Sequence, residues 1–205
     1  MTLFSKVFQI TMLLLFLTLF LGRTISLRAK HGVKVFTLVS GKHGLSRCIE
    51  LSFFILLPLW MCALCLRVFT PSLLAWDAPF LVSPTLRLIG SVLIVCGFSL
   101  FIWSLISFGR SWRIGIDTKN SGPLVTTGAF AYSRNPIFVF IDLYFVGSAL
   151  IDMTPLLIAF AMAVAAGMHY QILQEEGFLQ ARYGEEYRSY RARTSRYFTM
   201  RRWVP

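Results

Sequence analysis

Four long runs of this chain carry no charged residue, and that feature limits the folds open to it more than any other. Asp, Glu, Lys and Arg are all absent from residues 7–22, 51–66, 88–109 and 153–174. A helix needs about 20 mainly apolar residues to cross the hydrocarbon of a bilayer. A fifth apolar run, 135–151, is interrupted only by Asp142. The sequence therefore predicts an all-α integral membrane protein with about five transmembrane helices.

The chain is expected to form one membrane domain over residues 1–205. Residues 1–104 would supply spans one to three, and residues 105–205 would hold the catalytic region with spans four and five. A turn around Asp152 and Pro155 separates the last two apolar runs, so these runs are expected to form an antiparallel helical hairpin.

The positive charge is placed in a way that predicts topology. The net charge is +11, but 17 of the 20 Lys and Arg residues fall in residues 23–48, 109–135 and 173–205. With five spans these segments share one side of the membrane, as cytoplasmic loops do. We therefore expect the N-terminus outside, the C-terminus in the cytoplasm, contact with membrane lipids and no nucleic-acid partner. Charged residues that flank the first two runs, such as Lys6 and Arg67, are expected to snorkel to the interface.

The cysteines give no sign of a metal site. Cys62 and Cys65 are spaced as in redox and zinc motifs, but they lie inside an apolar run without a second pair or polar ligands nearby. They are interpreted as small helix residues, and no bound metal is predicted.

The stretch from Gly122 to Phe138 mixes turn formers, aromatic residues and charge between two apolar runs. Asn135 and Pro136 are typical of a helix start. The predicted hairpin places this stretch at the same end as Gln171 and Glu175, which lie one turn apart on one helix face. Backbone groups, aromatic faces and a carboxylate would suit a zwitterionic, adenine-containing ligand with a sulfonium group. The residues thus predict a cofactor pocket on the cytoplasmic side.

Three segments of the sequence together resemble the isoprenylcysteine carboxyl methyltransferase family, which is related to the phospholipid methyltransferases. They are the stretch Leu124–Phe138, Glu175-Glu176-x-x-Leu179, and Tyr183-Gly-Glu-Glu-Tyr-x-x-Tyr190. Phe108-Gly109-x-x-Trp112 is similar to the preceding segment of prokaryotic members. The resemblance covers residues 105–198 and implies a five-span methyltransferase. Its cofactor, S-adenosylmethionine, would enter from the cytoplasm and its lipophilic substrate from the bilayer.

The resemblance also implies which residues contact the cofactor. By position in the motif these are Gly122, Pro123, Leu124, Val125, Phe130, Asn135, Pro136, Ile137, Phe138 and Glu175. Asn135 and Phe138 stand where the family usually has His and Tyr, and cofactor binding is expected to tolerate both changes. No catalytic residue is assigned, because an acceptor that is already ionised needs no general base.

The methyl acceptor stays open between two main classes. The family name favours carboxyl O-methylation of an isoprenylcysteine. However, Gln171 stands where eukaryotic members have an arginine that faces the substrate, and a neutral amide balances a carboxylate poorly. Asp142, an acid within an apolar run, is a candidate for binding a substrate amine. That would favour N-methylation of phosphatidylethanolamine; another small lipophilic acceptor is a further alternative.

Two other classes of protein remain open. Membrane reductases that use NADPH share an Arg-x-Pro-x-Tyr-like region but have about twice as many spans. A non-catalytic protein that retains the fold is the other class, and Asn135 and Gln171 are the residues that argue for it.

Overall fold

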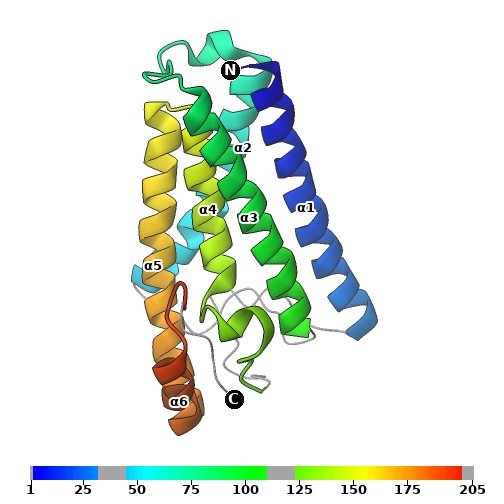
Figure 1. Cartoon of the computed structure of the whole chain (residues 1–205), viewed down its shortest axis with the longest axis vertical. Helices are drawn as coiled ribbons and strands as arrows, with labels where there is room; N and C mark the ends of the chain where they lie inside the picture. Colours follow the sequence, from blue (N-terminus) through cyan, green and yellow to red (C-terminus); the bar gives the residue numbers. More distant parts are fainter. Residues whose placement is uncertain (1, 32–44, 110–122, 200–205) are drawn as a thin grey trace.

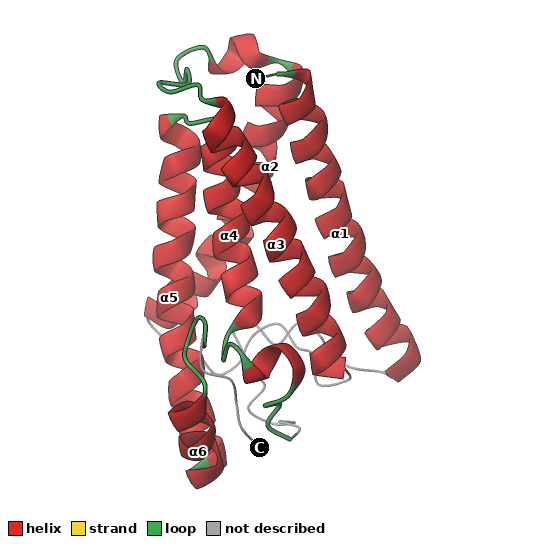
Figure 2. Cartoon of the chain, in the orientation of Figure 1, coloured by secondary structure: helices red, strands yellow, loops and turns green. Residues whose placement is uncertain are grey.

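The described chain is entirely helical (Figure 1). The structure is a computed structural model, and it describes residues 2–31, 45–109 and 123–199. Within these ranges there are six α-helices and no strand, as Figure 2 shows. The helices are α1 (Leu3–His31), α2 (Leu45–Phe69), α3 (Pro84–Phe108), α4 (Pro136–Ile151), α5 (Pro155–Tyr183) and α6 (Glu185–Arg193). Two short 3₁₀ turns, η1 (Pro71–Leu74) and η3 (Gly128–Ala131), lie in the connections.

The five long helices stand side by side in one bundle, and the remaining elements lie at its two ends (Figure 1). The N-terminus and η1 lie at one end, whereas η3 and α6 lie at the other. By length and apolar composition, three helices of the described residues are able to cross a membrane: α1, α3 and α5. Shorter apolar helical stretches cover Ile55–Phe69 and Pro136–Ile151. The all-helical class is confirmed, and a count of five spans stays a prediction.

Three helices begin at a serine, threonine or asparagine followed by proline, and the start of α4 at Asn135 and Pro136 was predicted from the sequence. The Ser83 side chain accepts the N–H of Leu86, and the Thr154 side chain accepts the N–H of Leu157. Proline at the next position loses nothing, because the first N–H groups of a helix have no partner within it. The turn from Ile151 to Pro155 closes the predicted α4–α5 hairpin.

Glycines bring α3 and α4 into close contact. A Cβ atom built on Gly90 would lie 2.5 Å from the carbonyl oxygen of Gly147, and one built on Gly147 would lie 2.6 Å from that of Gly90. Gly97 faces Phe140 and Leu143 at contact distance. Small residues with this spacing let two membrane helices approach closely. The Gly90 contact fixes the C-terminal half of α4 against α3, and the Gly97 contact lies nearer the start of α4, where the candidate site is.

Lys6, Arg23 and Arg67, the basic residues that flank the first two apolar runs, all bind other parts of the chain, and their snorkelling to the membrane interface stays a prediction. Arg67 is buried and pairs with Asp77 at 2.7 Å and with Asp152 at 2.5 Å. Lys6 donates to the carbonyl of Val68 at 2.9 Å, and Arg23 donates to the carbonyls of Leu105 and Gly109. The physical reason is that last-turn carbonyls lack partners within their helix and attract cations. These side chains therefore join helices to one another.

We expect the contact between Gly90 and Gly147 to contribute to the stability of the protein. Gly147→Ala places a methyl group 2.6 Å from a backbone oxygen and 2.7 Å from the Cγ1 atom of Ile94, so α3 and α4 must separate. We expect a loss of about 1–3 kcal/mol, which is typical of overpacking. Thermal unfolding of the purified protein in detergent measures it. The control is Gly22→Ala in α1, because nothing lies within 4 Å of its added Cβ. Equal melting temperatures for Gly147→Ala and the wild type would contradict the packing role.

Candidate functional site

The stretch that the sequence singles out folds against the end of α3. Gly128 adopts φ +62°, and an added Cβ would lie 2.2 Å from Oγ of Ser107. The same Oγ accepts the backbone N–H of Ala129 at 3.0 Å. The Phe130 ring packs edge-on against Phe108, with centroids 4.6 Å apart. Glycine is therefore required at position 128, both for its backbone conformation and for the close approach to α3.

Three successive carbonyls of this stretch are bound by α6 and by the segment that follows it. The donors are a tyrosine hydroxyl, a threonine hydroxyl and a backbone N–H. The pairs are Tyr190 to Phe130 at 2.7 Å, Thr194 to Ala131 at 3.5 Å, and Thr199 to Tyr132 at 2.7 Å. The backbone N–H of Arg134 in turn donates to the carbonyl of Ser195 at 3.0 Å. The C-terminal segment 194–199 thus packs along the base of α4.

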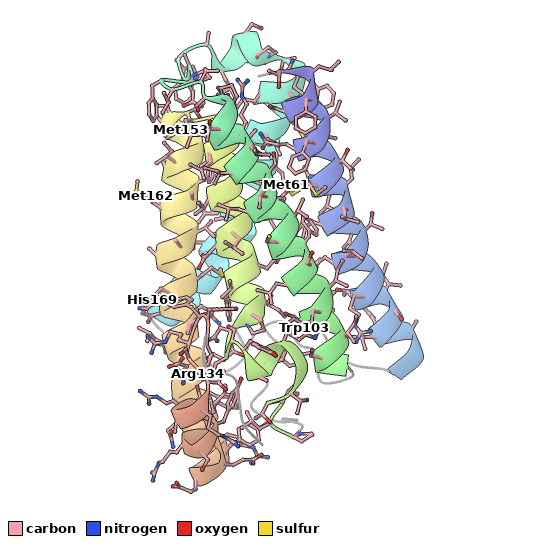
Figure 3. The ribbon with its side chains drawn as sticks, in the orientation of Figure 1. Met61, Trp103, Arg134, Met153, Met162 and His169 are labelled. Atoms are coloured by element: carbon pink, nitrogen blue, oxygen red, sulfur yellow. The ribbon has the colours of Figure 1, made fainter. Side chains whose placement is uncertain are left out.

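A buried carboxylate joins these parts electrostatically. Glu176 of α5 is 7% exposed and pairs with Arg134 at 3.0 Å. Arg196 approaches the same carboxylate with two nitrogens, at 3.0 and 2.9 Å. These hydrogen bonds raise the pKa of the Arg196 guanidinium above its ordinary value. Figure 3 places Arg134 beside the lower part of α5. We call Arg134, Glu176 and Arg196 the Glu176 cluster.

Asn135 directly precedes α4, as predicted, but its side chain does not cap the helix. Its amide nitrogen instead donates to the carbonyl of Arg196 at 3.1 Å. Its backbone N–H donates to Oγ of Ser133 at 3.1 Å. Asn135 is therefore a second link between the start of α4 and the C-terminal segment.

The predicted cofactor residues converge on one end of the bundle, but they differ in exposure. Gly122 lies outside the described residues. Pro123 is exposed, and Leu124, Val125, Ile137, Phe138 and Glu175 are half-buried. Phe130, Asn135 and Pro136 are buried. The hairpin brings the end of α5 beside the start of α4, as the sequence predicted. The half-buried residues are thus the ones with surface left for a ligand.

The two predicted acceptor residues lie deeper in the hairpin. Gln171 is buried on α5, one turn before Glu175. Asp142 is half-buried on α4, and its buried Oδ1 atom has no hydrogen-bond partner in the described part of the chain. The Tyr197 hydroxyl lies 2.5 Å from Nδ1 of His169. Burial raises the pKa of Tyr197, and the Asp142 carboxylate adds to this. The hydrogen bond between His169 and Tyr197 thus joins α5 to the C-terminal segment.

Several residues of this end were not singled out by the sequence. Glu176 forms the ion pairs with Arg134 and Arg196, and Arg196 and Thr199 of the C-terminal segment complete the arrangement. The one available signal was the spacing of Tyr187 and Tyr190, which places both on a single face of α6. Both side chains are buried against this end. Nothing in the local pattern around Arg196 indicates its partner.

Comparison with known families identifies the region that contains this site. Residues 86–186 match the phospholipid methyltransferase (PEMT) family. The match spans just under half of the chain, from the first turn of α3 to the start of α6. It includes η3 and the α4–α5 hairpin, and it ends before Arg196. No curated protein matches the chain significantly.

We expect the Glu176 cluster to hold residues 130–135 and 194–199 in place. Glu176→Gln leaves the buried Arg134 beside Arg196 without a countercharge, at a cost of about 3 kcal/mol. We expect faster hydrogen exchange in peptides covering residues 130–135 and 194–199, but not in α3. Glu185→Gln is the matched control, because Glu185 and its partner Arg188 are both exposed and such pairs contribute little. Unchanged exchange in Glu176→Gln would show that the cluster does not hold these segments.

Proposed function

Since residues 86–186 match the phospholipid methyltransferase family, we propose that this chain is an S-adenosylmethionine-dependent methyltransferase with a lipophilic acceptor. Membrane methyltransferases of this kind take their acceptor from the bilayer. The observation that carries the proposal is the position of the domain. It contains both the α4–α5 hairpin and the polar stretch that is anchored to the hairpin's base. The helices α3 and α5, which are long and apolar enough to cross a membrane, would keep that site in contact with lipid.

The residues at the base of the hairpin fit the cofactor chemically. S-adenosylmethionine carries an ammonium, a carboxylate, a sulfonium and an adenine ring. The Glu175 carboxylate suits the ammonium, and the half-buried ring of Phe138 suits the cation or the base. Backbone groups of Pro123 to Val125 lie outside any helix and suit polar edges. The side chains of Phe130, Asn135 and Pro136 are buried. We therefore propose that they hold the wall of the site, formed by residues 123–138, in place.

The protein's part in the reaction is alignment. When bound, the cofactor supplies a methyl group that its sulfonium already activates, so no nucleophilic side chain is required. The wall formed by residues 123–138 would orient the donor, and the apolar surfaces of α3 and α4 would guide the acceptor and exclude water. Gln171 and Asp142, deeper in the hairpin, would face the acceptor.

Two acceptor classes follow from the site. The motif resemblance favours a carboxylate, as in an isoprenylcysteine, which needs no base. Asp142 favours a phospholipid amine, because a buried carboxylate oxygen without a partner suits an ammonium group. An amine acceptor must lose a proton during methylation, and we propose the hydrogen-bonded His169–Tyr197 pair as the group that receives it.

We further propose that the site faces the cytoplasm and that five helices span the membrane. The end of α1, the start of α2 and the end of α3 lie at the same end of the bundle as α6 (Figure 1). The described parts of the three segments rich in Lys and Arg therefore share that end. Such clustering is typical of the cytoplasmic side. The N-terminus then lies outside.

Methyl transfer tests the proposed activity directly. The purified protein, in liposomes made from a total lipid extract, is incubated with methyl-labelled S-adenosylmethionine, and labelled lipids are identified by mass. We expect one labelled lipid class. Glu175→Gln should weaken cofactor binding about tenfold or more, as expected when a charge-assisted bond is lost, whereas Glu186→Gln on exposed α6 should not. Binding of NADPH instead of S-adenosylmethionine would contradict the proposal and favour a reductase.

The same assay separates the acceptor classes. With phosphatidylethanolamine as acceptor, Asp142→Asn should lower turnover at saturating cofactor without changing cofactor affinity, because the amide cannot balance an ammonium group. With a prenylcysteine carboxylate as acceptor, the same substitution should not lower turnover. Unchanged turnover on every active substrate would remove Asp142 from acceptor recognition.

A further inference from the structure

The segment Thr70–Ser83 lies at the end of the bundle opposite the candidate site, and it exposes its apolar side chains while it buries its charged one. We call it the 70–83 segment. Its large apolar side chains are exposed: Leu73 at 64%, Trp76 at 72% and Phe80 at 62%, with Leu81 and Val82 exposed beside them. Its single charged residue, Asp77, is completely buried. A connection that runs through water normally shows the opposite arrangement.

Polar contacts hold the 70–83 segment in this orientation. Asp77 pairs with Arg67 of α2 at 2.7 Å and also accepts the N–H of Leu156 at the start of α5, at 2.9 Å. Arg67 reaches Asp152 at the end of α4 as well. The backbone N–H of Phe80 donates to the carbonyl of Met153 at 3.1 Å. The segment is thus fixed to the α4–α5 turn and to α2 by its polar groups, with the apolar side chains pointing away.

The exposed apolar surface continues onto the helices. Leu88 and Ile89 in the first turns of α3, and Leu3 and Phe4 at the start of α1, are exposed at the same end. The 25 residues of α3 extend about 37 Å at about 1.5 Å per residue. This exceeds the roughly 30 Å of hydrocarbon, so the start of α3 reaches the headgroup region. The 70–83 segment therefore adjoins a lipid-facing surface.

From these observations we propose that the 70–83 segment is a membrane-interface element. Its partner is lipid: Trp76, Phe80 and Leu73 insert at the boundary between headgroups and acyl chains of the leaflet opposite the candidate site. Three features support this partner over water or protein. The outward surface carries no charge, it is continuous with lipid-facing helix surfaces, and it contains a tryptophan, which is enriched at this depth. The inference is independent of the methyltransferase activity.

Spin-label accessibility in liposomes tests the proposal on the full chain. Cys48, Cys62, Cys65 and Cys96 are replaced by alanine, and Trp76→Cys is labelled. Collisions with oxygen, which is concentrated in lipid, and with a water-soluble nickel chelate are then measured. Val92→Cys on the exposed face of α3 is the lipid reference, and Ser189→Cys on exposed α6 is the water reference. Phe80→Cys provides a second reading if Trp76→Cys does not fold.

The expected result is an oxygen-to-nickel accessibility ratio several-fold above that of Ser189→Cys and below that of Val92→Cys. A ratio equal to that of Ser189→Cys would place the segment in water and overturn the proposal. Low accessibility to both reagents would also overturn it, since the surface would then be covered by protein, such as a second copy of the chain.

Discussion

A single carboxylate, that of Glu176, holds three parts of the chain together at one end of the bundle. It receives Arg134 from the start of α4 and Arg196 from the C-terminal segment. The end of α5 that carries it is positioned by the α4–α5 hairpin. Without this charge, two guanidinium groups would stand beside each other in a largely buried place. The shape of the candidate site therefore depends on the Glu176 cluster more than on any residue predicted to touch the cofactor.

A second ionic arrangement occupies the other end. Arg67 pairs with Asp77 and Asp152, and all three side chains are buried. The two ends thus follow one principle: a buried charge at a helix end fixes a connection to the hairpin. Between them, α3 and α4 are joined by apolar packing and by the contact of Gly90 with Gly147. These buried ion pairs of the described residues thus lie at the ends of the bundle, and its middle is mainly apolar.

Much of the fold was predictable because it rests on local patterns. Uncharged runs predict the long helices, and proline after serine or threonine predicts where α3 and α5 begin. The hairpin follows from a short turn between two apolar runs. These signals act over a few residues, so the helix positions that they predict do not depend on contacts between distant parts of the chain.

The charged contacts were not predictable, because they join residues far apart in the sequence. Arg67 ends an apolar run, a pattern typical of a snorkelling residue, yet Asp152 binds it from 85 positions away. Glu175 and Glu176 are adjacent in the sequence. Only the rotation of α5 decides that Glu176 faces the arginines. The cofactor residues were inferred from a motif, and that motif ends before Arg196.

We propose that the cofactor binds between the stretch 123–138 and the lower part of α5. Ultraviolet cross-linking of labelled S-adenosylmethionine to the purified protein, with the modified peptides mapped by mass spectrometry, tests it most directly. The account predicts label in peptides that contain residues 123–138 or 169–183, and competition by unlabelled cofactor. Label confined to α1, α2 or the 70–83 segment, or label that the unlabelled cofactor does not displace, would contradict it.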